Sequence, residues 1–124
     1  LRESKFAWAE LLRQQDRRAD AVKLYRELAA DVRSKEGSAA AYYVLEDTFE
    51  KGDMDKTEKA IFAYSEREPQ AYWLAKAFIL LGDVYVRKGD NFQARATYQS
   101  VADGYSPADD GIVDEAKERI AKLN

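Results

Sequence analysis

The sequence has no histidine and no cysteine among its 124 residues. These two residue types carry much of the side-chain chemistry near neutral pH, because histidine titrates there and the cysteine thiolate is a strong nucleophile. Their absence excludes a serine–histidine–aspartate triad, a thiolate nucleophile, a histidine general base, a Cys/His zinc site and any disulfide. An enzyme would have to work with carboxylates alone, as some glycoside hydrolases do across a real cleft. We therefore expect no enzymatic activity.

Long apolar runs are also missing. The longest, 39–45, has 7 residues, whereas a membrane-spanning helix needs about 20, so no direct membrane insertion is expected. With 2 Pro, 6 Gly and 46% hydrophobic residues, the composition is that of one ordinary folded domain. The 23 acidic residues outnumber the 20 basic ones, for a net charge of −3. This balance disfavours nucleic-acid binding.

No cofactor and no metal site are expected. The sequence contains neither a GxGxxG nor a GxxxxGK[ST] phosphate-binding motif. Four carboxylates near the C-terminus lack the alternating ligand spacing and central glycine of an EF-hand loop. At the start of an expected helix they compensate the helix dipole instead. They are Asp109, Asp110, Asp114 and Glu115.

Apolar residues recur at helical spacing almost throughout the chain, and no long stretch alternates with the period of a half-buried strand. Glycine and proline mark the breaks, and an aspartate after a glycine can cap the next helix. Seven helices are predicted, near residues 3–15, 18–34, 38–51, 54–66, 70–88, 91–104 and 110–123. The breaks are short, so neighbouring helices are expected to run antiparallel.

The strongest internal unit runs from 75 to 106 and forms one helical hairpin. Gly82 and Ala94 are small where its two helices cross, and larger side chains fill the space around that crossing. The order of these features is aromatic, Leu-Gly, Tyr, a Gly-Asp turn, Ala, aromatic and a closing proline. It resembles the tetratricopeptide repeat. The residues that carry the resemblance are Phe78, Leu81, Gly82, Tyr85, Gly89, Asp90, Ala94, Tyr98, Val101 and Pro107.

Two weaker copies of the unit lie upstream. The small position recurs at Ala21, Thr57 and Ala94, at intervals of 36 and 37 residues, against about 34 in the family. The resemblance implies an all-α superhelix, a single domain over 1–124 built from three helical hairpins and a capping helix. The expected repeats are about 2–35, 38–70 and 75–107, and the cap is about 110–123.

The last repeat and the cap are similar to the C-terminal repeats of exported Gram-negative bacterial tetratricopeptide proteins. This similarity rests on the stretch from Gly89 to Pro107 and on the Asp114–Ile120 segment. It implies a scaffold or adaptor in the periplasm or cell envelope, with the cytoplasm as the alternative, and a chain that is the C-terminal part of a longer protein.

In such solenoids the first helix of each hairpin lines the concave wall, so the resemblance implies partner binding there. A residue one step after a buried position is turned about 100° from it. One step on from the expected core, an acidic residue recurs on all three first helices, with an apolar residue one turn before it. The candidate binding residues are Phe6, Glu10, Arg13, Tyr42, Glu46, Phe49, Ile79, Asp83, Val86 and Arg87.

We expect this surface to bind a protein or peptide segment that is apolar and carries one or more Lys or Arg. Two alternatives stay open. The acidic residues can simply be solvated, with Tyr42 and Phe49 in the core, or the same surfaces can join two copies of the chain as a homodimer. Charge reversal at Glu46 and Asp83 separates binding from packing, because only packing residues are needed for folding.

Overall fold

The computed structural model describes residues 1–107 and 109–123, and all regular secondary structure in these residues is helical. The prediction of an all-α chain is confirmed. This part of the chain contains one 3-10 segment, η1 (Ala29–Asp31), and seven α-helices: α1 (Arg2–Gln14), α2 (Arg18–Leu28), α3 (Lys35–Glu50), α4 (Met54–Ser65), α5 (Ala71–Arg87), α6 (Asn91–Gly104) and α7 (Ile112–Ala121).

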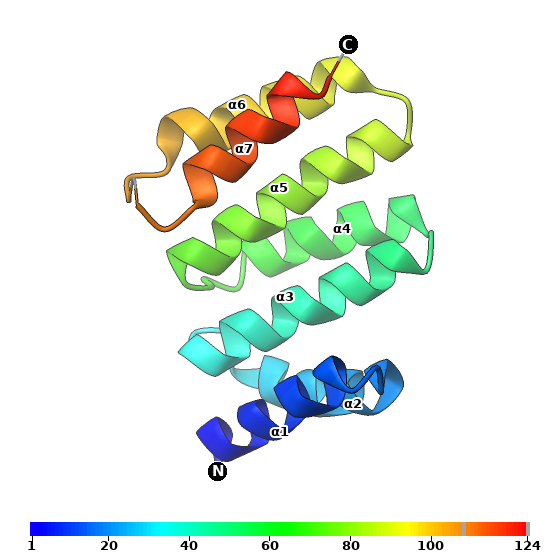
Figure 1. Cartoon of the computed structure of the whole chain (residues 1–124), viewed down its shortest axis with the longest axis vertical. Coiled ribbons are helices and arrows are strands. Elements are labelled where there is room, and N and C mark those ends of the chain that lie inside the picture. The colour runs from blue at the N-terminus through cyan, green and yellow to red at the C-terminus, as the bar shows by residue number, and fades with distance from the viewer. Residues whose placement is uncertain (108, 124) are drawn as a thin grey trace.

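The helices form two layers (Figure 1). Helices α1, α3, α5 and α7 lie side by side, and each contacts the next. Helices α2, α4 and α6 form the other layer, and each contacts the helix before it and the helix after it in the chain. We call the exposed surface of α1, α3, α5 and α7 the odd-helix face.

Two of the predicted turns form as the sequence indicates. Gly52 and Gly89 both adopt positive φ, at 94° and 79°, a conformation that costs glycine little. The following aspartates cap the next helices, because Asp53 accepts the Lys56 N–H at 3.0 Å and Asp90 accepts the Gln93 N–H at 3.0 Å. These caps fix where α4 and α6 begin.

The start of α3 differs from the prediction. The expected helix over 18–34 is shorter and runs into η1, and α3 begins directly after Ser34. The Ser34 hydroxyl accepts the Gly37 N–H at 2.9 Å and donates to the Asp31 carbonyl at 2.7 Å. Gly37 therefore lies inside the first turn of α3 rather than ending a helix. A Cβ there would come within 1.7 Å of the Asp31 carbonyl oxygen.

The close crossing of α5 and α6 is confirmed. A Cβ on Gly82 would lie 2.2 Å from the ring of Tyr98, so only glycine allows that ring to pack against the α5 backbone. Ala94 is fully buried on the facing helix. This crossing fixes the two helices from which the third hairpin is built.

The core has two parts. A large cluster extends from α3 to α7, and a smaller one joins α1, α2 and the start of α3. Helix α7 enters the large cluster through Ile112 and Ala116, while Lys117 and Glu118 on its other side are exposed. Within residues 1–107 and 109–123, no helix has the length and apolar character needed to cross a bilayer.

Candidate functional site

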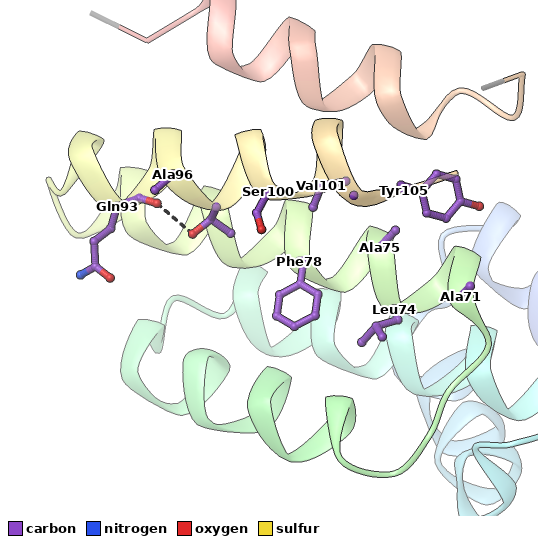
Figure 2. Close-up of a pocket in the computed structure, with 11 residues that line it drawn as sticks. Ala71, Leu74, Ala75, Phe78, Gln93, Ala96, Ser100, Val101 and Tyr105 are labelled. Atoms are coloured by element: carbon purple, nitrogen blue, oxygen red, sulfur yellow. Dashed lines mark hydrogen bonds between the residues drawn. The ribbon is translucent and has the colours of Figure 1, made fainter. Parts of the chain in front are cut away.

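A groove of about 530 Å³ lies between α5 and α6 (Figure 2). Helix α5 contributes Phe78 and Leu74, and α6 contributes small side chains. None of the lining residues is charged, in a chain with 35% charged residues. The lining is Ala71, Leu74, Ala75, Phe78, Gln93, Ala96, Thr97, Ser100, Val101, Gly104 and Tyr105.

The sequence interpretation missed this groove, although the repeat spacing contained a signal for it. Arg67, two residues past the end of α4, donates to the Ala29 carbonyl of η1 at 2.7 Å and lines a smaller cavity beside α2 and α3. The residue 37 positions later is Gly104, which has no side chain to form such a contact. The cavity that Arg67 lines measures about 330 Å³, against about 530 Å³ for the α5–α6 groove, where Gly104 leaves the space free.

On the odd-helix face, the first of the three acidic residues is held inside the protein. Glu10 accepts hydrogen bonds from the Tyr25 hydroxyl and from Arg13, whose Nη2 lies 2.8 Å from Glu10 Oε2. Burial and the bond to Glu10 raise the pKa of Tyr25. Arg13 also lies over the Tyr43 ring, 4.6 Å from its centroid. Glu10 and Arg13 thus join α1 to α2 and α3.

The third acidic residue is held in the same way. Asp83 accepts a hydrogen bond from the Tyr98 hydroxyl and two from Arg119 on α7, at 3.0 and 3.3 Å. Burial and the bond to Asp83 raise the pKa of Tyr98. Glu115 on α7 also contacts Lys76 on α5 at 3.2 Å. Helix α7 therefore covers part of the wall that the sequence predicted to be open.

The middle acidic residue, Glu46, is different. It is half-buried, and no side chain among the described residues forms a hydrogen bond or ion pair with it. Burial, together with the nearby Glu50 carboxylate, raises the pKa of Glu46. A carboxylate that loses water and gains no partner is an unfavourable arrangement for the folded protein alone.

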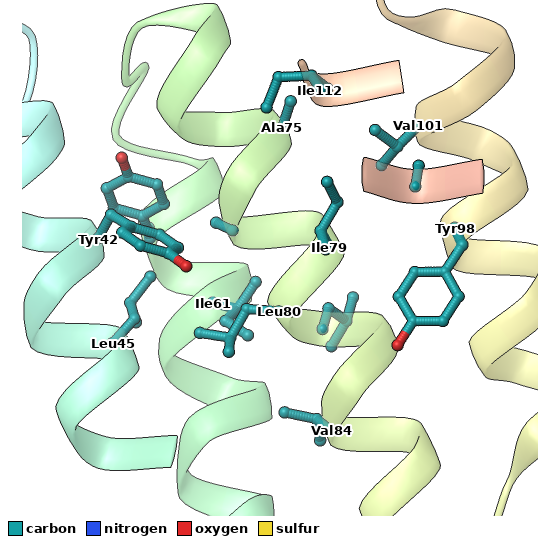
Figure 3. Close-up of a cluster of buried hydrophobic side chains, with 14 of the residues drawn as sticks. Tyr42, Leu45, Ile61, Ala75, Ile79, Leu80, Val84, Tyr98, Val101 and Ile112 are labelled. Carbon is teal, nitrogen blue, oxygen red and sulfur yellow. The ribbon is translucent and has the colours of Figure 1, made fainter. Parts of the chain in front are cut away.

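The apolar position of the predicted set needs a correction. Tyr42 is 7% exposed and Ile79 is 2% exposed, so both lie in the core rather than on an accessible wall. Figure 3 shows them in the large cluster, with Ile79 among side chains of α5, α6 and α7 that include Val101 and Ile112. The one-step rule failed at these positions because neighbouring helices cover both residues.

The remaining predicted residues stay near the surface. Phe6 is half-buried against Tyr25, with the ring centroids 6.0 Å apart. A cavity of about 350 Å³ brings four others together with Tyr98 and the end of α7. Within it Arg87 lies over the Phe49 ring, 4.6 Å from the centroid. The four are Phe49, Asp83, Val86 and Arg87.

A run of aromatic contacts links α1 to α5 and passes through the buried Tyr25 of α2. Tyr43 packs on Tyr25 at 5.0 Å and on Trp73 at 5.6 Å, and Trp73 packs on Tyr72 at 5.0 Å between ring centroids. Trp73 thus packs against α3, while Tyr72 is 36% exposed. Lys76 lies over the Tyr42 ring at 5.7 Å.

The arrangement of the carboxylates does not support a metal site. In residues 1–107 and 109–123, no three carboxylates gather as a metal-binding group. Asp110 instead accepts the Ile112 N–H at 3.2 Å at the start of α7 and a hydrogen bond from the Tyr105 hydroxyl. Burial and this bond raise the pKa of Tyr105 to about 12.

No protein family, curated protein or solved structure matches this chain.

Proposed function

We propose that the chain is a non-catalytic protein-binding module, a tetratricopeptide-like arc that binds a protein or peptide segment on its odd-helix face. Helices α1, α3, α5 and α7 contact one another in turn, whereas no pair among α2, α4 and α6 does so within the described residues. A stack that is tighter on one side curves toward that side. This supports the odd-helix face as the concave wall.

The observation that carries the proposal is the aromatic run with cations stacked on it. Phe6, Tyr43 and Trp73 are half-buried and Tyr72 is exposed, so the run offers rigid apolar surface to a partner. Aromatic and arginine side chains are the residues most enriched at the energetic centres of protein interfaces. A catalytic role has less support, because Glu10 and Asp83 are engaged by tyrosine and arginine donors.

The similarity of the last repeat to exported bacterial proteins supports a location in the periplasm or cell envelope. The cytoplasm is the alternative location. A comparison of periplasmic and cytoplasmic fractions from the source cells, probed with an antibody to this segment, decides between them.

A matched pair of double variants tests the proposed binding face. Glu46→Gln with Tyr72→Ala changes the odd-helix face, and Glu66→Gln with Phe92→Ala makes the same kind of change elsewhere at exposed positions. Affinity capture from source-cell extract is compared for the wild type and both variants. We expect a partner that the wild type and the Glu66/Phe92 variant retain and the Glu46/Tyr72 variant loses. Equal retention by all three would place binding on another surface.

Self-association is the second candidate function, and two exposed apolar features favour it. Trp8 and Leu11 on α1 are 54% and 43% exposed, and the groove between α5 and α6 is open. Gly104→Arg is a suitable test, because a Cβ at Gly104 meets nothing within 4 Å. Sedimentation velocity over a range of concentrations should show a dimer that this variant weakens if the groove joins two copies. A monomer at all concentrations would exclude this function.

A further inference from the structure

We propose that Glu46 is the seat for one positively charged side chain, a lysine or arginine, of the bound segment. This inference rests on the proposed function and narrows it, since of the three predicted acidic positions, Glu10, Glu46 and Asp83, only Glu46 is available to a partner. Its support comes from the spacing of the repeats, the pairing of the nearby cations and the aromatic surroundings.

The repeat spacing shows why Glu46 lacks an internal donor. Glu10 accepts from Tyr25 and Asp83 accepts from Tyr98, and in each case the tyrosine lies 15 residues after the acid. The residue 15 positions after Glu46 is Ile61, which is fully buried and has no hydroxyl. The second helix pair therefore presents its acid without the tyrosine that holds the other two.

Three cations lie near enough to act electrostatically on Glu46, and each forms an ion pair with another carboxylate. Arg13 binds Glu10 at 2.8 Å, Lys76 binds Glu115 at 3.2 Å, and Arg18 pairs with Asp47 at 3.2 Å and also with Glu50. These cations attract Glu46 electrostatically without pairing with it. A carboxylate that is half-buried and has no direct ion pair is complementary to a cation brought by a partner.

The rings beside Glu46 suit such a cation. Tyr43 and Tyr42, three and four residues before it, each carry a cation of the protein over the ring, from Arg13 and Lys76. Phe49, three residues after it, carries Arg87. The face around Glu46 thus already binds positive groups on aromatic rings. The partner's charged side chain would be flanked by apolar residues that rest on the half-buried rings of Tyr43 and Phe49.

The test is selection from a random 16-residue peptide library displayed on phage. The targets are the wild type, Glu46→Gln, which keeps the side-chain volume and removes the charge, and Glu36→Gln, a control near the other end of the same helix that leaves the Arg18–Glu50 pair intact. Circular dichroism and thermal melting first establish that all three proteins are folded. Selected peptides are then synthesised, and their binding is measured by fluorescence polarisation.

We expect the wild type and the Glu36 variant to select peptides with a lysine or arginine beside an aromatic or aliphatic residue. Those peptides should bind Glu46→Gln at least tenfold more weakly. If the selected peptides are uncharged and bind Glu46→Gln equally well, Glu46 does not bind a cation of the partner. The proposed binding face would not be contradicted by that result. If no peptide is enriched on the wild type, both the seat and the proposed peptide-binding function fail.

Discussion

Two tyrosine hydroxyls at equivalent positions, those of Tyr25 and Tyr98, hold two of the acidic residues of the odd-helix face. At this scale a residue's role follows from its partners rather than from its position in a repeat. Glu10 and Asp83 join helices, and charge reversal at Asp83 would therefore damage packing as well as binding. Glu46 joins nothing among the described residues.

Replacing Glu46 and replacing Glu10 should change the free energy of unfolding in opposite directions. Burial raises the pKa of Glu46, so the unfolded chain ionises first and the charge costs stability above the unfolded pKa of about 4.3. Glu46→Gln should leave stability at pH 7 unchanged or raise it by about 0.5 kcal/mol. Glu10→Gln should lower it by about 1–2 kcal/mol, because its charged hydrogen bonds weaken. Urea unfolding of both variants measures this, and a loss at Glu46 equal to that at Glu10 would contradict it.

The buried tyrosines predict a loss of stability in alkali. The pKa of Tyr98 is raised by burial and by its bond to Asp83, so above about pH 10 the unfolded chain releases this proton first. Stability then falls with rising pH, by at most about 1.4 kcal/mol per pH unit for each such phenol. Tyr98→Phe should flatten this decline between pH 10 and 11.5 in urea titrations. A decline as steep as that of the wild type would show that this phenol does not contribute.

At the scale of the helices, the crossing of α5 and α6 makes a sharp prediction. Gly82→Ala should destabilise the protein by about 1–3 kcal/mol, because the added methyl group overlaps the ring of Tyr98. Gly104→Ala, on the facing helix, meets nothing within 4 Å and should be neutral or slightly stabilising. Thermal or urea unfolding compares the two. Equal changes in the free energy of unfolding for the two variants would mean that α5 and α6 pack less closely than the structure shows.

The sequence predicted the helices well, and its errors have physical causes. Periodicity places both ends of every α-helix in the described residues within three residues, except that α2 ends six residues before the predicted position 34. It cannot tell a glycine that ends a helix from one required by a close carbonyl, as at Gly37. It placed Ile79 at the surface, and it placed Tyr42 there in one of two alternatives, of which the core alternative is the right one. Periodicity cannot decide such cases because what covers a helix depends on its neighbours. It also missed the α5–α6 groove, because Ala96 and Gly104 resemble ordinary helix residues until the packing is known.

At the scale of the whole molecule, the two ends of the helical stack should differ in their resistance to local unfolding. The cluster that joins α1, α2 and the start of α3 contains six buried residues, against eighteen in the cluster that extends from α3 to α7. Stacked helical pairs contact only their neighbours, so their stability is a sum of local terms. Hydrogen exchange should give α1 amides opening free energies about 2 kcal/mol or more below those of α5. Exchange of both helices at one common rate would show a single cooperative unit.

The claim that the odd-helix face binds a protein partner is tested most directly by site-specific photo-crosslinking in source cells. A benzophenone amino acid replaces Tyr72 on that face in one variant and Phe92, the most exposed aromatic side chain, in another. The account predicts one crosslinked protein from position 72 that is absent from position 92 and is lost when Glu46→Gln is added. The same product from both positions, or none from position 72, would contradict it.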